Sequence, residues 1–229
     1  MERLSRDEMY SIALKMDLST LISISQANKS FYQKVFKNDS IWKHRIKTEF
    51  PNCVNFRLDL SPKQRYSLLY CLNKLKKITK LNYNVDSIFY FEILDLDNRN
   101  LTELPKEIAL LEKLKYLAVS RNKLSKIPKE IFQMTNLNNL CLSFNNLTYL
   151  PKEIGNLRKL KSLFINSNQI TNLPKEIGKL ENLESIFMNN NQITEIPKEI
   201  TELPKLERIV AYGNPIKIIP KKLLGILRI

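Results

Sequence analysis

Few side chains of this 229-residue chain are of the types that perform catalysis. His44 is the only histidine, so most hydrolytic triads and histidine-based metal sites are excluded. The cysteines, Cys53, Cys71 and Cys141, are odd in number and form no Cys-x-x-Cys pair, which argues against a disulfide framework and a zinc site. No glycine-rich phosphate loop is present. We therefore expect no catalytic residues, no cofactor and no metal, and we expect that the chain is not an enzyme.

The side chains with the clearest binding chemistry are two phenylalanines. Phe164 and Phe187 are 23 residues apart, and each stands between two apolar residues. Because successive side chains of a strand point to opposite faces, the apolar neighbours should face the core and the two rings should face solvent. Adjacent exposed aromatic rings often mark a binding hot spot. The alternative is that the rings lie flat against each other and only cover the sheet.

The 23-residue spacing comes from a repeat that fills residues 91–229 without insertion or deletion. A Leu-Pro-Lys-Glu-Ile motif such as Leu104–Ile108 follows the strand part of the unit, and its proline favours a turn. A fixed period of this length is typical of a solenoid, in which each repeat adds one strand to a parallel sheet and one layer to a continuous core. We therefore predict an α/β solenoid preceded by a small all-α domain. The six units begin at Phe91, Leu114, Leu137, Leu160, Leu183 and Leu206.

An asparagine recurs at the same phase of five units. A side-chain amide has donors and an acceptor, so a buried one can satisfy backbone groups of its own turn and of the adjacent turn. We interpret these residues as scaffold and not as a binding site. Arg99 takes this place in the first unit, which indicates an atypical terminal repeat. The five asparagines are Asn122, Asn145, Asn168, Asn191 and Asn214.

The full pattern, Leu-x-x-Leu-x-Leu-x-x-Asn-x-Leu followed by Leu-Pro-Lys-Glu-Ile, resembles the leucine-rich repeat family over residues 91–229. It is similar to the short cytoplasmic, Ras-group-like and bacterial subclasses. The resemblance implies a curved horseshoe with parallel strands on its concave face, and this face typically binds other proteins. We call the outward-pointing strand positions the strand face. Its expected partner-binding residues are Tyr116, Phe144, Phe164, Phe187, Tyr212, Asp95, Asp97 and Arg208.

Residues 1–90 have helical spacing, with helices predicted over about 5–16, 20–36, 38–50 and 62–79. The first three resemble an F-box over residues 1–50. The residues that carry this resemblance are Leu4, Ile12, Asp17, Leu21, Ile24, Ser25, Lys29, Phe31, Ser40, Ile41 and Trp42.

The F-box resemblance implies binding to a Skp-type adaptor of a cullin-type ubiquitin ligase. The family's opening Leu-Pro is Leu4-Ser5 here, so adaptor binding stays open. The alternative is a three-helix cap that only seals the solenoid. The predicted domains are an F-box-like domain over 1–50, a helical linker and N-terminal cap over 51–90, and six 23-residue repeats over 91–229. The adaptor-facing or domain-core residues would be Leu4, Ile12, Leu21, Ile24 and Trp42.

The net charge of +14 would suit an acidic partner, a nucleic acid or an anionic membrane face. No base-reading motif is present, so nucleic acid is not favoured over a solvated lysine-rich surface. No apolar run reaches the ~20 residues of a membrane helix, and the first residues lack the apolar stretch of a signal peptide. We therefore expect no membrane partner and an intracellular, cytoplasmic location.

The end of the array suggests a self-association edge. The sixth unit ends at Arg228 and only Ile229 follows, so we expect no seventh unit and an open sheet edge. The core residues there would meet solvent unless 223–227 folds over them, and we hypothesise a homodimer through this edge. These residues are Ile209, Ile216, Ile219 and Leu223.

Two functions follow from these patterns. The first is a non-enzymatic protein–protein interaction module that serves as a substrate-recognition subunit of a cullin-type ubiquitin ligase. The alternative is a self-associating structural or virion-associated scaffold with a basic surface. An F-box-like region before repeats in a Lys/Asn/Ile-rich chain is similar to proteins of large DNA viruses, a resemblance that implies the host cytoplasm or the virion as location.

Overall fold

The structure, a computed structural model, describes Met16, Thr20, Ser23 and residues 38–229. Contacts within the chain form two compact units, Met1–Asn73 and Lys74–Ile229. In the described part of the chain, no helix is long and apolar enough to cross a membrane. The helices predicted over 5–16 and 20–36 fall mainly on residues outside this part. The adaptor-facing residues outside it are Leu4, Ile12, Leu21 and Ile24.

The first unit contains the helix predicted at Asn38 and most of the helix predicted at Pro62, which continues into the second unit. α4 (Asp39–Glu49) begins where the Asn38 side chain accepts a hydrogen bond from the Ser40 N–H, at 3.0 Å, and a 3₁₀ turn, η2 (Pro51–Cys53), follows it. α5 (Pro62–Thr79) begins with a reciprocal capping box: the Ser61 N–H donates to the Gln64 side chain, and the Gln64 N–H donates to the Ser61 hydroxyl. These caps satisfy helix-end donors that would otherwise stay unpaired, so the local sequence alone sets both helix starts.

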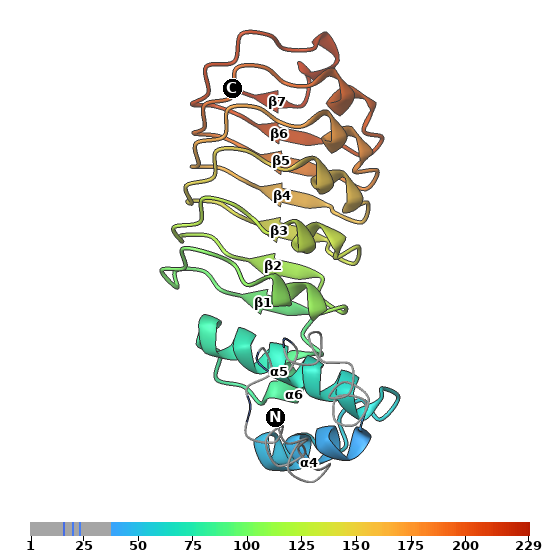
Figure 1. Ribbon diagram of the computed structural model, residues 1–229. Coiled ribbons are helices and arrows are strands. Elements are labelled where there is room, and N and C mark those ends of the chain that lie inside the picture. The colour runs from blue at the N-terminus through green and yellow to red at the C-terminus, as the bar shows by residue number, and fades with distance from the viewer. Residues whose placement is uncertain (1–15, 17–19, 21–22, 24–37) are drawn as a thin grey trace. The chain divides into compact units, whose positions relative to one another are not determined.

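The second unit is a parallel sheet of seven strands in chain order, and Figure 1 shows them stacked one after another following α6 (Val85–Ile88). Leu94, Leu117 and Leu140 pair in register and are buried, and the later strands continue this row with the same 23-residue step up to Ile209. The predicted solenoid with one continuous core is therefore confirmed. The strands are β1 (Ile93–Asp95), β2 (Tyr116–Ala118), β3 (Asn139–Cys141), β4 (Ser162–Phe164), β5 (Ser185–Phe187), β6 (Arg208–Val210) and β7 (Leu227–Arg228).

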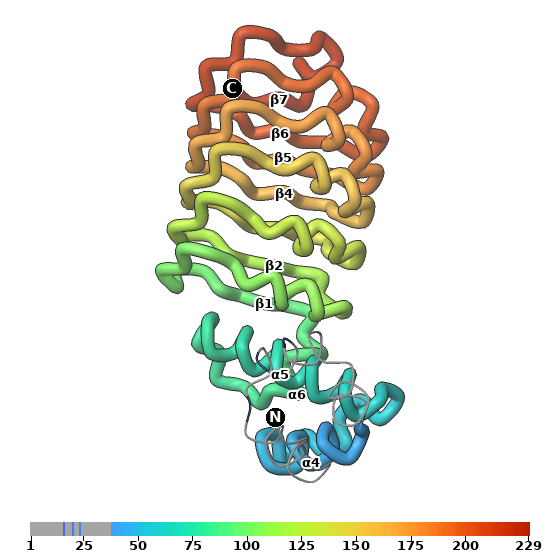
Figure 2. The backbone as a smooth tube through the Cα atoms, viewed as in Figure 1, coloured from blue at the N-terminus to red at the C-terminus, as the bar shows by residue number. Residues whose placement is uncertain are grey.

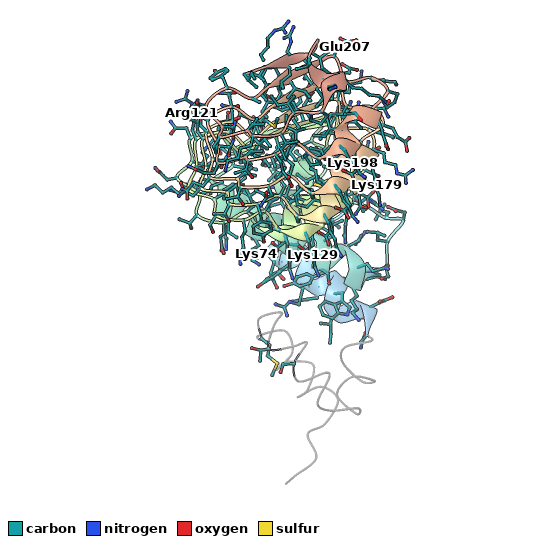
Figure 3. The ribbon with its side chains drawn as sticks, turned by 90° about the horizontal axis from the view of Figure 1, so that it is seen from above. Lys74, Arg121, Lys129, Lys179, Lys198 and Glu207 are labelled. Atoms are coloured by element: carbon teal, nitrogen blue, oxygen red, sulfur yellow. The ribbon has the colours of Figure 1, made fainter. Side chains whose placement is uncertain are left out.

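Each proline of the repeat motif is followed by a 3₁₀ turn on the side opposite the strands. Figure 2 shows these turns as a second column along the array, and Figure 3 places Lys129, Lys179 and Lys198 on this side, away from Arg121. Gly155 lies where a Cβ would come within 2.7 Å of the Glu176 carbonyl oxygen, so glycine permits the close approach of successive turns. The turns are η3 (Lys106–Leu110), η4 (Lys129–Gln133), η5 (Lys152–Asn156), η6 (Lys175–Lys179), η7 (Lys198–Glu202) and η8 (Lys221–Leu223).

The recurring asparagines form the predicted ladder between turns. The Asn168 side-chain nitrogen donates to the carbonyls of Ile165, in its own turn, and Leu142, in the preceding turn, at 3.1 and 3.0 Å. Its oxygen accepts from the Leu147 N–H at 3.0 Å. The other four asparagines repeat these three contacts one turn apart, which confirms their role as scaffold. Arg99, at the same phase of the first 23-residue repeat, is exposed.

The end of the chain folds over the edge of the sixth repeat, the alternative that the sequence left open for residues 223–227. β7 pairs with β6 through Ile209 and Leu227, which are 18 residues apart instead of 23. The chain shortens its last turn because η8 ends at Leu223 and leads almost directly into the strand. Ile209 and Leu223 are consequently buried, while Ile216 and Ile219 are half-buried.

Candidate functional site

The two phenylalanines meet at the centre of the strand face. Phe164 on β4 and Phe187 on β5 are register partners, and their rings stack with centroids 4.7 Å apart and planes 8° from parallel. Both side chains are half-buried because each ring covers part of the other. The flat arrangement foreseen as the alternative is the one adopted, and it leaves one outer aromatic surface spanning two strands.

An apolar row extends from this pair across neighbouring strands. Cys141 pairs with Phe164 on one side, and Val210 pairs with Phe187 on the other. Beside the rings the row is flanked by small polar residues, Ser162 and Ser185, whose hydroxyls hydrogen-bond at 3.2 Å. A flat apolar row with small neighbours leaves room for a large partner surface to approach, and it forms no enclosed cavity. This is the geometry of a protein contact.

Tyr116 and Cys141 lie together at the start of this row. The Cys141 thiol donates to the Tyr116 hydroxyl at 3.4 Å, so Tyr116 is half-buried and less available than the sequence predicts. This hydrogen bond, with burial, raises the pKa of Tyr116 to about 12. Burial raises the pKa of the Cys141 thiol, which disfavours the thiolate that a nucleophile needs.

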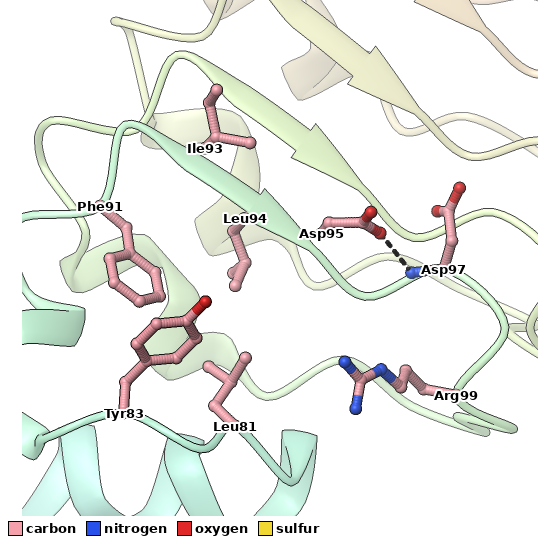
Figure 4. A pocket seen from close by; sticks show the side chains of 8 residues that line it. All are labelled: Leu81, Tyr83, Phe91, Ile93, Leu94, Asp95, Asp97 and Arg99. Carbon is pink, nitrogen blue, oxygen red and sulfur yellow. Dashed lines mark hydrogen bonds between the residues drawn. The ribbon is translucent and has the colours of Figure 1, made fainter.

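Asp95 and Asp97 stand at the β1 end of the strand face, beside a pocket of about 420 Å³ (Figure 4). The Asp95 carboxylate accepts the Asp97 N–H at 2.9 Å, and the Asp97 carboxylate accepts the Ser120 N–H at 2.5 Å. Burial and, to a smaller extent, the Asp95 charge raise the pKa of Asp97. The wall opposite is apolar: Tyr83 packs edge-on against Phe91 at 5.0 Å. This end of the face suits a contact of mixed apolar and acidic character.

Phe144 adopts a backbone conformation that bulky residues avoid. Its φ is 54°, its side chain is 47% exposed, and the Arg121 guanidinium lies 4.8 Å from its ring centre. Arg121 itself has φ 56°. The equivalent residue of each 23-residue repeat, from Asn98 in the first to Gly213 in the sixth, also has a left-handed backbone. The contact between Arg121 and Phe144 was not predicted from the sequence. The signal that could have indicated it is their spacing of 23 residues, which places them at the same position of adjacent repeats.

Arg208 and Tyr212 extend the strand face on the β6 side. Arg208 pairs with Ser185, next to the phenylalanine pair, and both Arg208 and Tyr212 are exposed, Tyr212 by 51%. Asp95 and Asp97 lie three strands away from Phe164, at the other end of the sheet. The predicted residues therefore form a central aromatic group with a basic neighbour and a separate acidic group.

Trp42 does not offer an exposed surface to an adaptor. It is completely buried in the first unit, where its ring lies 5.5 Å from that of Tyr66. Of the two roles that the F-box resemblance allows for this residue, adaptor contact or domain core, the structure places it in the core. Within the described residues, no group of three or more His, Cys, Asp or Glu side chains could hold a metal ion.

Comparison with known proteins agrees with this architecture. The family described as leucine-rich repeat region matches residues 67–167 and 145–228. The match begins within α5, ahead of the first 23-residue repeat at Phe91. A leucine-rich repeat protein of Leptospira interrogans is 37% identical with a TM-score of 0.60, over 64% of this chain. This chain spans only 40% of the length of that protein.

A second solved structure, the plant peptide hormone receptor RGFR1 in complex with RGF2, is 35% identical with a TM-score of 0.47 over 50% of this chain and 19% of the receptor. No curated protein gives a significant match. Because the matched segments together cover residues 67–228, well over half of the sequence, the chain belongs to the leucine-rich repeat family.

Proposed function

We propose that this chain binds another protein through its strand face, with Phe164 and Phe187 at the centre of the contact. The observation that carries the proposal is the stacked pair, which lies in the solvent-facing row of a rigid sheet. Leucine-rich repeat proteins generally mediate protein–protein interaction, and they are typically not enzymes. The strand face supports this role with an apolar centre and polar or charged residues on both sides.

The stacked rings are well suited to act as an anchor. Two aromatic rings held against each other lose little side-chain freedom on binding, so more of the contact energy remains as affinity. The 23-residue backbone frame holds both rings at fixed spacing before a partner arrives. Replacing both rings with alanine tests the proposal, because capture of the partner should be lost while the repeat array stays folded.

For the N-terminal region we propose the finer role of a substrate-recognition subunit in a cullin-type ubiquitin ligase. The F-box-like sequence of residues 1–50 supports this role, as does the position of Trp42 in a helical core next to α5. In this arrangement a Skp-type adaptor binds residues 1–50, and the strand face presents the target.

A pull-down with a Skp-type adaptor tests the ligase role. We expect the wild-type chain to be retained and Leu21→Asp to lose retention by about tenfold or more, as expected when a charge enters an apolar interface. Tyr149→Asp is the matched control, because Tyr149 is 54% exposed, lies in the repeat array and belongs to none of the proposed contact surfaces. Trp42→Ala is a poor probe, since loss of a fully buried ring would unfold the region. A wild-type chain that the adaptor does not retain would contradict the ligase role.

The alternative function, a self-associating scaffold, is supported by exposed apolar residues around β7. Ile218, Leu224 and Ile229 are 64%, 66% and 69% exposed. Since β7 covers Ile209 and Leu223, a homodimer would use these outer residues and the free edge of β7. The net charge of +14 opposes the approach of two copies, so association should strengthen with salt.

Light scattering measures this self-association directly. We expect a dimer mass for the wild-type chain at high concentration and physiological salt, and a monomer mass for a variant with Ile218→Asp and Leu224→Asp. These residues are exposed, so the substitutions should leave the fold intact. A monomer mass for the wild-type chain under these conditions would rule out the scaffold function.

A further inference from the structure

A cavity of about 490 Å³ lies in the first unit, apart from the strand face. It opens to solvent and is bordered by α4, the connecting segment 54–60 and the start of α5. Its volume is within the range of sites that hold small molecules, about 300–1,000 Å³. The lining residues are Lys43, Ile46, Lys47, Val54, Asn55, Leu58, Leu60, Pro62 and Arg65.

Arg65 is the unusual member of this lining. The residue is only 7% exposed, and its Nε is buried without a hydrogen-bond partner in the structure. A guanidinium stays charged at all physiological pH values, and a buried donor without a hydrogen-bond partner is unfavourable. The guanidinium therefore lacks a hydrogen bond at its buried Nε, and its terminal nitrogens are the donors that remain for an acceptor entering the cavity.

The other charges around the cavity increase its preference for an anion. Lys43 and Lys47 are one helical turn apart on α4 and repel each other at this spacing. Glu49, a carboxylate in the last turn of α4, is already engaged: it accepts from Arg45 and from the Tyr66 hydroxyl, each at 2.8 Å. The lining itself holds three cations and no carboxylate.

Apart from Asn55, the remaining lining is apolar, and most of it comes from the segment 54–60. Leu58 and Val54 are 68% and 42% exposed, so the cavity has a hydrophobic rim as well as an apolar floor. Arg57, with φ 48°, makes a two-nitrogen contact with the Asp59 carboxylate at 2.8 and 2.7 Å. This two-nitrogen contact links Arg57 and Asp59 within the segment between Val54 and Leu60, and the cavity is present in the structure without a ligand.

We propose that this cavity binds a small amphiphile with one carboxylate on an apolar chain. The two carboxylate oxygens accept hydrogen bonds from the two terminal nitrogens of the Arg65 guanidinium, a two-point geometry that a guanidinium favours. Lys43 and Lys47 attract the same negative charge at longer range. The apolar chain lies against Leu58, Val54 and the other aliphatic lining residues.

Titration of the full chain with decanoate below its micelle concentration tests this site. Trp42 is the only tryptophan, adjoins Lys43 in α4, and lies 5.5 Å from Tyr66, the residue after Arg65. We expect a saturable change in its fluorescence and a rise in Tm. Decanol, which has the same chain without the charge, should bind about tenfold or more weakly, since hydrogen bonds to charged groups are the strong ones.

Two sets of variants separate a ligand site from a structural role of Arg65. Arg65→Met should weaken decanoate binding about tenfold or more and leave the Tm of the free chain unchanged or raised, because it removes a guanidinium whose Nε is buried without a hydrogen-bond partner. Lys43→Gln with Lys47→Gln, both at exposed positions, should also weaken binding. Lys77→Met, at an exposed position on α5 outside the cavity, is the control and should bind like wild type.

Three results would overturn the proposal: no saturable response to decanoate, equal affinity for decanol, or unchanged decanoate affinity in the Lys43→Gln, Lys47→Gln chain. The last result remains decisive even if Arg65→Met fails to fold. Because none of these residues lies on the strand face, the outcome is independent of whether the chain captures a protein partner there.

Discussion

Asn168→Ala is expected to lower the free energy of unfolding of the repeat array by about 3–5 kcal/mol. The substitution removes a buried amide that bonds two turns at once, with the Leu142 and Ile165 carbonyls as acceptors and the Leu147 N–H as donor. The Leu147 N–H is left without a partner, which costs about 1–3 kcal/mol, whereas the Leu142 and Ile165 carbonyls keep hydrogen bonds from Asn145 and Asn191, so each lost bond to them costs about 0.5–1.5 kcal/mol. Asn168 lies in the middle of the ladder, so its loss also weakens the coupling between the first and last repeats. Urea unfolding followed by far-UV circular dichroism measures both effects.

Matched variants make this result specific to the ladder. Asn172→Ala, in the loop after β4 in the same unit, removes an exposed amide and should change stability by less than about 0.5 kcal/mol. Asn214→Ala, at the half-buried end of the ladder, should cost less than Asn168→Ala. Because stability in a solenoid is approximately a sum of repeat and interface terms, the central variant should also broaden the transition. An Asn168→Ala chain as stable as wild type would show that backbone pairing alone holds the turns.

Capture of a partner protein is expected to fall by about a hundredfold or more when Phe164 and Phe187 are both replaced by alanine. Hot-spot aromatic residues at the centre of an interface contribute about 2 kcal/mol or more each, so loss of two gives at least this effect. The half-buried stack contributes to folding as well, at about 0.5–1.5 kcal/mol for the ring pair, which the core of the array should tolerate. Affinity for a co-purified partner, measured by surface plasmon resonance, provides the readout.

The control for this variant is an exposed aromatic residue outside the strand face. Tyr149 is 54% exposed and lies in the loop after β3, so Tyr149→Ala should bind like wild type. Circular dichroism of each variant separates loss of contact from loss of fold. Full binding by the folded double variant would contradict a contact at the two rings. It would place the binding site at Asp95 and Asp97 or at Arg208 and Tyr212 instead.

The repeat interior could be predicted from the sequence because its causes are local and periodic. Leu117 and Leu140 pair because both occupy the same phase of a 23-residue unit, and the same phase places Asn145 and Asn168 in one ladder. The start of α5 was predictable from the capping box at Ser61, which acts within four residues. No comparison with another chain was needed for these features.

The last turn of the array departs from the 23-residue period, so the repeat length does not predict it. A strict 23-residue step places the next strand beyond Arg228, but the chain pairs Leu227 with Ile209 after 18 residues. The shorter turn lets Leu227 enter the core and cover the edge of β6, where it is only 7% exposed. Burial of the open edge therefore overrides the repeat length, and nothing within the repeat motif predicts it.

The sequence by itself determined the solenoid, its register and its asparagine scaffold, because these depend on residue type at a fixed spacing. Only the tertiary structure decided whether Phe164 and Phe187 stack, that Arg121 lies over Phe144, and that the buried Nε of Arg65 has no hydrogen-bond partner. Such features depend on distances between side chains from different turns or helices. Those distances are set by how closely the backbone layers pack, and the order of residues along the chain does not specify them.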